Sequence, residues 1–363
     1  DIPVLPRVPR EELLEELATD FAAPGAGLPA LLARLLETSN HVHHPHFIGH
    51  QVSAPLPAAI LAEATSALLS NGMAIYEMGP AAVAVELTVL DWMLGKLGWQ
   101  AARWPGQGGA GPHGAGVLTH GGSLANLTAL LAARARVAPD AWEEGVPGDL
   151  AVLAPPTSHY SVARATSIMG LGRKALFSLD VDEKDVSRPE RLQETLNAVQ
   201  AAGRRPLALV ANACSTATGL FDPLEPIATF CRENEIWLHV DGCHGASARL
   251  SAREGGRLDG VESADSVVWD AHKMLRTSGL CAAVLFRDEK AFDSAFKQKA
   301  SYLFYGRQEA GVDLIHRTVE CTKMPLGLKL FLNLAWHGES ALGASWDDRL
   351  AVTRRFAERV RAR

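Results

Sequence analysis

Between residues 116 and 286, short apolar runs alternate with segments whose apolar residues recur at helical spacing. The apolar runs are nearly continuous, which is typical of parallel strands covered on both faces. Expected strands lie at 116–119, 150–154, 174–178, 206–212, 236–240 and 265–269, with expected helices at 123–137, 160–169, 188–202 and 224–234. This alternation predicts a three-layer α/β domain with a mostly parallel sheet.

The segments on either side of this region are expected to be mainly helical. Helices are expected at 10–38 (one or two), 58–70, 80–97 and 322–337, and an antiparallel strand at 280–286. The helix that starts at Pro80 has proline in its first turn and Gly98 just past its end, an arrangement typical of helix termini. The Gly-rich stretch 103–115 lacks periodicity and predicts a surface loop.

Composition excludes several classes of protein. The 363 residues are 47% hydrophobic, enough for a large core, and a net charge of −6 with scattered Lys and Arg argues against a nucleic-acid surface. The apolar runs are too short to span a membrane, and no secretory signal is visible. The five cysteines lack metal-site spacing. We therefore expect a cytoplasmic protein with free thiols and without membrane or nucleic-acid partners.

Two of the expected strands end in charged residues that suit a single cofactor. The apolar run 266–269 is followed by Asp270 and Lys273, and the run 237–240 is followed by Asp241. Parallel strands deliver their carboxyl ends to one edge of a sheet. A lysine there can form a Schiff base with an aldehyde, and an aspartate can pair with a protonated pyridine nitrogen. The pair predicts a pyridoxal phosphate site, although a surface lysine remains an alternative.

Three further strand ends carry groups that could contact such a cofactor. Gly122 and Ser123 open a helix whose free N–H groups could hold a phosphate, or Ser123 could simply cap that helix. His159 could stack on a ring or act as a surface cap. Ser215 and Thr216 could bond a ring hydroxyl or form an ordinary turn. Each signal is ambiguous alone, and their joint occurrence favours the cofactor site.

The ordered motifs resemble one enzyme family. They read Gly-Gly-Ser-x-x-Asn, Ser-His-Tyr-Ser, Ser-Thr-x-x-Gly-x-Phe-Asp-Pro, His-Val-Asp-x-x-x-Gly and Asp-Ala-His-Lys. This set resembles the group II pyridoxal phosphate-dependent decarboxylases, which include the glutamate, cysteine sulfinate, aromatic amino acid and 2,4-diaminobutyrate enzymes. The resemblance runs from about His44 to about Trp336 and implies the aspartate aminotransferase fold (fold type I).

The resemblance implies roles for individual residues. Lys273 would be the Schiff-base lysine, Asp241 the partner of the pyridine nitrogen, and His159 the residue stacked on one ring face. Cys243, where the family usually has alanine, would touch the other face. The other implied cofactor contacts are Gly122, Ser123, Asn126, Ser215, Thr216, Asp270 and His272. The implied reaction is α-decarboxylation of an L-amino acid, in a homodimer with its site at the subunit interface.

The sequence departs from the family where product and substrate are decided. A loop tyrosine commonly protonates the substrate carbon in the family; here Tyr305 is the only tyrosine of 305–320, and His316 is the next proton carrier. An aldehyde product or transamination therefore stays open. Gln51 resembles a carboxylate contact of the glutamate branch, which favours an acidic substrate.

The domain organisation follows from the same resemblance. We expect an N-terminal helical segment at 1–80 and a cofactor domain at 81–320. The C-terminal small domain of the family should be incomplete in this chain, with 321–363 as its start.

Other interpretations of the chain remain open. Another fold type I lyase, an aldehyde-forming decarboxylase, or a truncated protein that binds the cofactor without turnover would share the same motifs. The histidine-rich stretch 41–50 lacks nearby acidic or cysteine partners, so no metal site is expected there.

Overall fold

The computed structural model describes residues 3–22, 25, 27–49, 51–101, 113–296 and 312–363. The chain divides into two units, Asp1–Ala54 and Pro55–Arg363. The predicted boundaries near residues 80 and 320 stay predictions. In the smaller unit, the expected helical segment 10–38 forms two helices, α1 (Arg10–Ala22) and α2 (Leu28–Thr38). An ion pair of 2.6 Å between Asp20 and Arg34 joins them.

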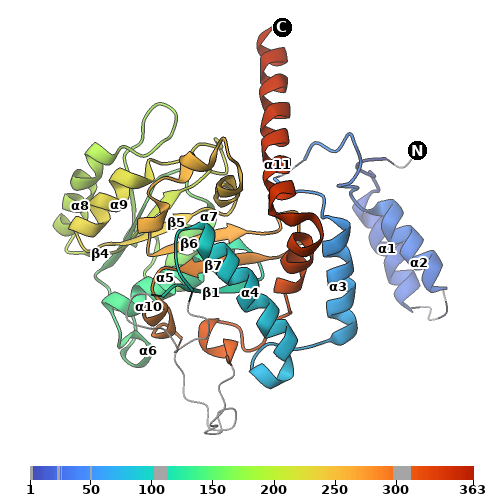
Figure 1. The fold of residues 1–363 in the computed structure, drawn as a ribbon, viewed down its shortest axis with the longest axis horizontal. Coiled ribbons are helices and arrows are strands. Elements are labelled where there is room, and N and C mark those ends of the chain that lie inside the picture. Colours follow the sequence, from blue (N-terminus) through green and yellow to red (C-terminus); the bar gives the residue numbers. More distant parts are fainter. Residues whose placement is uncertain (1–2, 23–24, 26, 50, 102–112, 297–311) are drawn as a thin grey trace. The chain divides into compact units, whose positions relative to one another are not determined.

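A seven-stranded sheet forms the centre of the larger unit (Figure 1). Its strands are β1 (Ala115–Thr119), β2 (Leu150–Ala154), β3 (Leu176–Ser178), β4 (Arg205–Asn212), β5 (Trp237–Asp241), β6 (Ser266–Asp270) and β7 (Ala282–Phe286), in the spatial order β1-β7-β6-β5-β4-β2-β3. Strands β2 to β6 pair in parallel, whereas β7 runs antiparallel to both β1 and β6. The mostly parallel sheet and the antiparallel strand near 280–286 are therefore confirmed.

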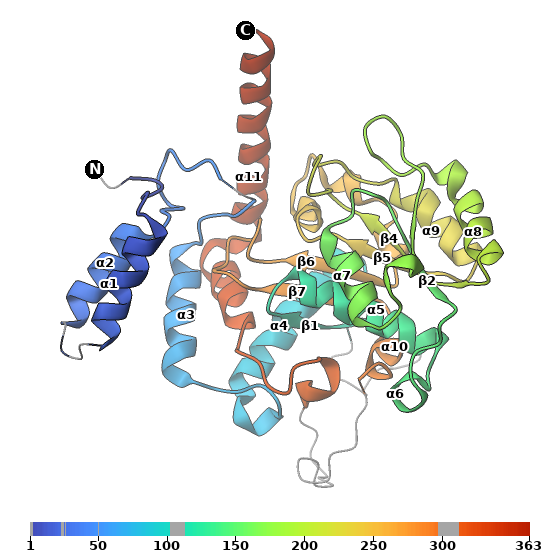
Figure 2. The same ribbon diagram turned by 180° about the vertical axis from the view of Figure 1, so that it is seen from behind.

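Helices cover both faces of this sheet. The helices of the larger unit are α3 (Pro57–Leu69), α4 (Pro80–Lys96), α5 (Gly122–Val137), α6 (Ala141–Glu144), α7 (Tyr160–Ile168), α8 (Leu192–Ala201), α9 (Leu224–Glu233), α10 (Glu289–Asp293) and α11 (Gly327–Arg361). One core layer packs α4, α8, α9 and α11 on the sheet, and the other packs α5, α7 and α10, which Figure 2 shows from their side. Alternate residues of a strand serve opposite layers, as Val152 and Leu153 do.

The helix expected at 322–337 begins later than predicted. Residues 322–326 are not helical, and α11 begins at Gly327 and continues to Arg361. Pro325 disfavours helical geometry in the residue before it, and Lys323 of this segment forms a buried ion pair with Glu86 of α4. Past the expected end, Gly338 leaves helical geometry at φ +75°, and the chain resumes as helix beyond it.

None of the described helices combines the length and the apolar character that crossing a bilayer requires.

Candidate active site

The carboxyl ends of the central strands meet at one edge of the sheet, where ligands bind in open α/β folds. The register pairs Asp241 at the end of β5 with Asn212 at the end of β4. Across β7, Ala282 pairs with Thr119 of β1 on one side and with Asp270 of β6 on the other. Strand β7 therefore brings the turn after β1 next to the lysine-bearing turn after β6.

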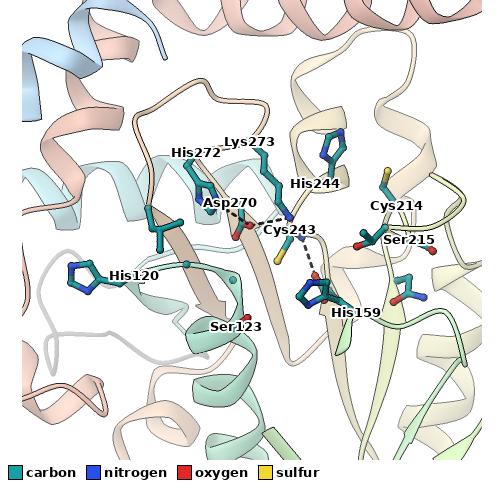
Figure 3. Close-up of a pocket in the computed structure, with 16 residues that line it drawn as sticks. His120, Ser123, His159, Cys214, Ser215, Cys243, His244, Asp270, His272 and Lys273 are labelled. Carbon is teal, nitrogen blue, oxygen red and sulfur yellow. Dashed lines mark hydrogen bonds and ion pairs between the residues drawn. The ribbon is translucent and has the colours of Figure 1, made fainter. Parts of the chain in front are cut away.

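A pocket of about 330 Å³ opens at this edge (Figure 3). Most of the residues that the sequence predicts for cofactor binding line it. These are Gly122, Ser123, His159, Ser215, Thr216, Asp241, Cys243, Asp270, His272 and Lys273. They follow or end five different strands, so only folding brings them together.

Lys273 projects into the pocket from the turn after β6 (Figure 3). Its Nζ lies 3.1 Å from Oδ2 of Asp270, and its side chain is 24% exposed. Burial lowers the pKa of Lys273, but the charge of Asp270 and other nearby groups outweigh burial and raise that pKa above its ordinary value. The amine is thus held in place without being sealed from the pocket. An amine in this position can condense with an aldehyde that enters the pocket.

Asp241 presents its carboxylate to the same pocket. Its Oδ2 accepts a hydrogen bond of 2.9 Å from Asn126 Nδ2, and its Oδ1 accepts one of 3.2 Å from the Cys243 N–H. Burial raises the pKa of Asp241, but the hydrogen bonds from Cys243 and Asn126 lower it below its ordinary value. Asp241 therefore keeps a negative charge in a buried position, which suits it to pair with a cationic ring nitrogen.

The N-terminus of α5 provides an anion-binding wall. Gly121 has φ +104°, a conformation that favours glycine, and turns the chain from β1 into α5. No described side chain caps this helix, so its first N–H groups are available to a ligand. A Cβ on Gly122 would lie only 2.5 Å from Cys243 Sγ, which leaves room for glycine alone. His272 adds an imidazole, with Nε2 3.7 Å from Asp270 Oδ2.

His159 caps the N-terminus of α7 and lines the pocket with its ring. Its Nδ1 lies 2.8 Å from Ser161 Oγ and also accepts the Ser161 N–H. Burial lowers the pKa of His159, which favours the neutral ring. A neutral imidazole offers a flat face on which an aromatic ligand can stack.

These groups fit pyridoxal phosphate. The pocket offers an amine for the aldehyde, a buried carboxylate for the ring nitrogen and an uncapped helix start for the phosphate. In addition, Ser215 Oγ is buried at the pocket and has no hydrogen-bond partner among the described residues. A ligand oxygen would supply that partner.

Four residues of the predicted site are not among the described residues that line the pocket. Asn126 does not line the pocket; it is buried behind Asp241 on α5. Gln51 belongs to the smaller unit, and Tyr305 lies outside the described residues. His316 lies in a 3₁₀ helix, Leu314–Arg317, and is not among the described residues that line the pocket.

The pocket also contains residues that the sequence did not single out, namely His120, Gly121, Asn212, Cys214, His244 and Leu280. Gly121, Cys214 and His244 directly flank predicted positions and His120 lies two residues before Gly122, so their place in the sequence was a usable signal, whereas Leu280 gave none. Burial, followed by the charge of Lys273, lowers the pKa of His244 to about 4. Among the described residues, no cluster of three or more His, Cys, Asp or Glu side chains is arranged to hold a metal ion.

The fold and the pocket define a fold type I pyridoxal phosphate enzyme. Residues 32–363 match the pyridoxal-dependent decarboxylase conserved domain, and the chain belongs to that family. This membership confirms the predicted family, cofactor and class of enzyme, an amino acid decarboxylase.

Individual relatives agree with this assignment. Over 363 residues the chain is 30% identical to the cysteine sulfinic acid decarboxylase of Rattus norvegicus, covering 97% of this chain and 71% of that protein. It is 28% identical to the acidic amino acid decarboxylase GADL1 of Homo sapiens, covering 97% of this chain and 66% of that protein. The crystal structure of mouse CSAD in apo form superposes with a TM-score of 0.90 at 29% identity, covering 99% of this chain and 74% of that one.

Proposed function

We propose that this chain catalyses the α-decarboxylation of an acidic L-amino acid. The observation that carries the proposal is the presence of Lys273 and Asp241 in one pocket beside an uncapped helix start. Two relatives are named for acidic substrates, cysteine sulfinic acid in one case and acidic amino acids in the other, and these names support an acidic substrate here.

In this proposal Lys273 Nζ binds the cofactor aldehyde, Asp241 pairs with its ring nitrogen and His159 lies against its ring. The other proposed cofactor contacts are Gly122, Ser123, Ser215, Thr216, Cys243, Asp270 and His272, whereas Asn126, also predicted from the sequence, acts through Asp241. When bound, pyridoxal phosphate supplies a π-system that accepts the electron pair left by departing CO₂. The chain contributes the orientation of that ring and a fixed negative charge at Asp241.

An amine product requires a proton at the substrate Cα. Tyr305 and His316 stay the candidates from the sequence, and Lys273 Nζ can also carry a proton within the pocket. His120 and His244 line the pocket with imidazoles that could meet an acidic side chain, in addition to the proposed contact of Gln51.

We further propose that the protein is a homodimer. Helix α3 packs one side on α11, and its other side exposes Ile60, Leu61 and Leu68 at 46%, 63% and 85%. These residues share a stripe at helical spacing, and exposed apolar stripes of this kind mark interaction surfaces. Sedimentation of a purely monomeric, fully active protein would contradict this proposal.

A cytoplasmic location is proposed from the thiols. All five cysteines are free, and two of them, Cys231 and Cys281, are buried. A reducing compartment keeps such thiols in this form.

The proposed activity is tested by supplying pyridoxal phosphate to the purified protein. We expect CO₂ release from cysteine sulfinate, aspartate or glutamate, with the amine and the aldehyde measured together to define the product. Diaminobutyrate and aromatic amino acids serve as competing substrates, and Lys273→Ala as the inactive control. Release of CO₂ only from aromatic or diamino substrates would overturn the acidic assignment, and no release from any of them would overturn the activity.

A further inference from the structure

A buried hydrogen-bond network lies behind Asp241 and His159, the two groups proposed to face the cofactor ring. His239 is on β5, two residues before Asp241, so its side chain points to the same face of the sheet. Its side chain is fully buried. Its Nε2 lies 2.9 Å from Asn126 Oδ1, and its Nδ1 lies 2.9 Å from Ser266 Oγ. The network thus links β5, β6 and α5.

The direction of each hydrogen bond in this network follows from groups that can only donate or only accept. Trp237 Nε1 can only donate, and it donates to Ser266 Oγ at 2.8 Å. The Ser266 hydroxyl is then free to donate to His239 Nδ1. Asn126 presents its Nδ2 to the Asp241 carboxylate, so its Oδ1 faces His239. The neutral His239 ring therefore carries its proton on Nε2, which donates to that oxygen. In this arrangement every polar atom of the His239 ring is satisfied by the neutral form.

At Asn126 the network divides. The amide Nδ2 donates to Asp241 Oδ2 at 2.9 Å and to Ser161 Oγ at 2.9 Å. Since Ser161 Oγ accepts that bond, its hydroxyl can donate to His159 Nδ1, 2.8 Å away. One amide group thus reaches both the carboxylate proposed for the ring nitrogen and the imidazole proposed for the ring face.

Flipping the side-chain amide of Asn126 would create unfavourable contacts at both of its ends. Exchanging its oxygen and nitrogen would set Oδ1 against the Asp241 carboxylate and two acceptors would face each other. The same exchange would place an N–H group against the Nε2–H of His239. With its Nε2–H donating to Oδ1, His239 therefore reinforces the orientation of Asn126 that serves Asp241.

We propose that His239 and Asn126 are positioning residues that jointly hold Asp241 and His159 for the cofactor. His239 fixes the amide of Asn126, and the two N–H groups of that amide fix the Asp241 carboxylate directly and the His159 ring through Ser161. This inference rests on the roles proposed above for Asp241 and His159, and adds what keeps both in place.

The first experiment uses the cofactor-free parent protein. Nitrogen-15 NMR of histidine-labelled protein reports which ring nitrogen carries the proton. We expect His239 to be neutral with its proton on Nε2 at pH 6 to 7, and His159 to have an unprotonated Nδ1. A proton on Nδ1 of His239, or a cationic His239 at pH 6, would overturn the proposal without any variant.

The second experiment measures the dissociation constant for pyridoxal phosphate in variants. His239→Leu removes the donor to Asn126 and should weaken binding about tenfold or more, whereas His239→Gln keeps an amide donor there and should stay within about threefold. Ser161→Ala cuts only the branch to His159, so it should alter the His159 NMR signals and leave those of His239 unchanged. Equal binding by the parent and His239→Leu, or equal losses in both His239 variants, would contradict the inference.

Circular dichroism first checks that each variant folds. If His239→Leu does not fold, His239→Asn replaces it, because its shorter amide does not reach Asn126. The two proposals fail separately: a parent that binds the cofactor and shows the expected NMR signals but releases no CO₂ rejects only the activity. A parent that releases CO₂ while His239→Leu binds and reacts like the parent rejects only the positioning role.

Discussion

Lys273 and Lys323 are each paired with a carboxylate, and these two lysines differ in access to solvent. Lys273 lies 3.1 Å from Asp270 at the pocket and keeps 24% of its side chain exposed. Lys323 pairs with Glu86 between α4 and the segment before α11, and both side chains are fully buried. Glu86 also accepts the N–H of Leu118 at 3.0 Å, so its second oxygen is engaged as well.

The difference separates a reactive lysine from a structural one. The partner of Lys273 retains an unpaired buried oxygen, Asp270 Oδ1, among the described residues, and the pocket gives a ligand access to the amine. The Lys323–Glu86 pair is fully buried, and the second oxygen of Glu86 accepts the backbone N–H of Leu118. Buried pairs of this kind hold elements in register, and removing one partner leaves an uncompensated charge.

The largest expected effect separates the two lysines by their chemistry. Lys273→Ala should lose covalent retention of pyridoxal phosphate and all measurable turnover, because no other lysine lines the pocket among the described residues. Borohydride reduction followed by mass spectrometry measures the retention. Lys323→Met is the matched control and should retain the label wherever it folds. A labelled Lys273→Ala protein would show that a different lysine reacts.

The next effect concerns stability. Lys323→Met leaves Glu86 buried without a cation and should lower the free energy of unfolding by about 3–5 kcal/mol. Denaturant unfolding of the cofactor-free protein measures this change. The double variant Glu86→Gln with Lys323→Met removes both charges and keeps an acceptor for the Leu118 N–H, so it should recover most of the loss. A double variant as unstable as the single one would show that packing, and not the unpaired charge, is responsible.

A third test uses His239, a buried titratable side chain whose ring is hydrogen-bonded to the neutral side chains of Ser266 and Asn126. Burial lowers the pKa of His239 to about 4, against about 6.5 in an unfolded chain. The unfolded chain therefore takes up the proton first, and stability is lost as the pH falls from about 6.5 to about 4, by up to about 3 kcal/mol. His239→Gln should flatten this part of the curve of unfolding free energy against pH. Unchanged curves in parent and variant would contradict the neutral, buried imidazole.

The smallest effect on activity is expected for Cys243, which lines the pocket together with Lys273. Cys243→Ala removes the thiol hydrogen bond that helps to lower the pKa of Asp241, while Asp241 keeps its bonds from the backbone N–H of residue 243 and from Asn126. One such bond is worth about 1 kcal/mol, so kcat/KM should change by less than about tenfold. Steady-state CO₂ release measures it, with the exposed Cys321→Ala as control. A loss beyond about a hundredfold would assign Cys243 a direct part in the reaction.

Local sequence patterns predicted most of the fold because each strand is a short apolar run that ends in polar residues. The runs before Asp241 and Asp270 became β5 and β6 with their ends at the pocket. The start of α11 was misjudged: Pro325 was a local signal against helix there, whereas the burial of Lys323 depends on Glu86, which is far away in the sequence. The same holds for Asn126, whose motif suggested cofactor contact and whose contacts are set by packing against β5.

The sequence by itself determined which strands end in chemically active groups, because a strand and its last side chain are adjacent in the chain. Only the tertiary structure decided how those ends meet. Insertion of β7 between β1 and β6 sets the start of α5 beside the Lys273 turn, and burial of His239 fixes a single hydrogen-bonding arrangement around Asn126. Both depend on contacts between residues far apart in the chain, which local sequence patterns do not encode.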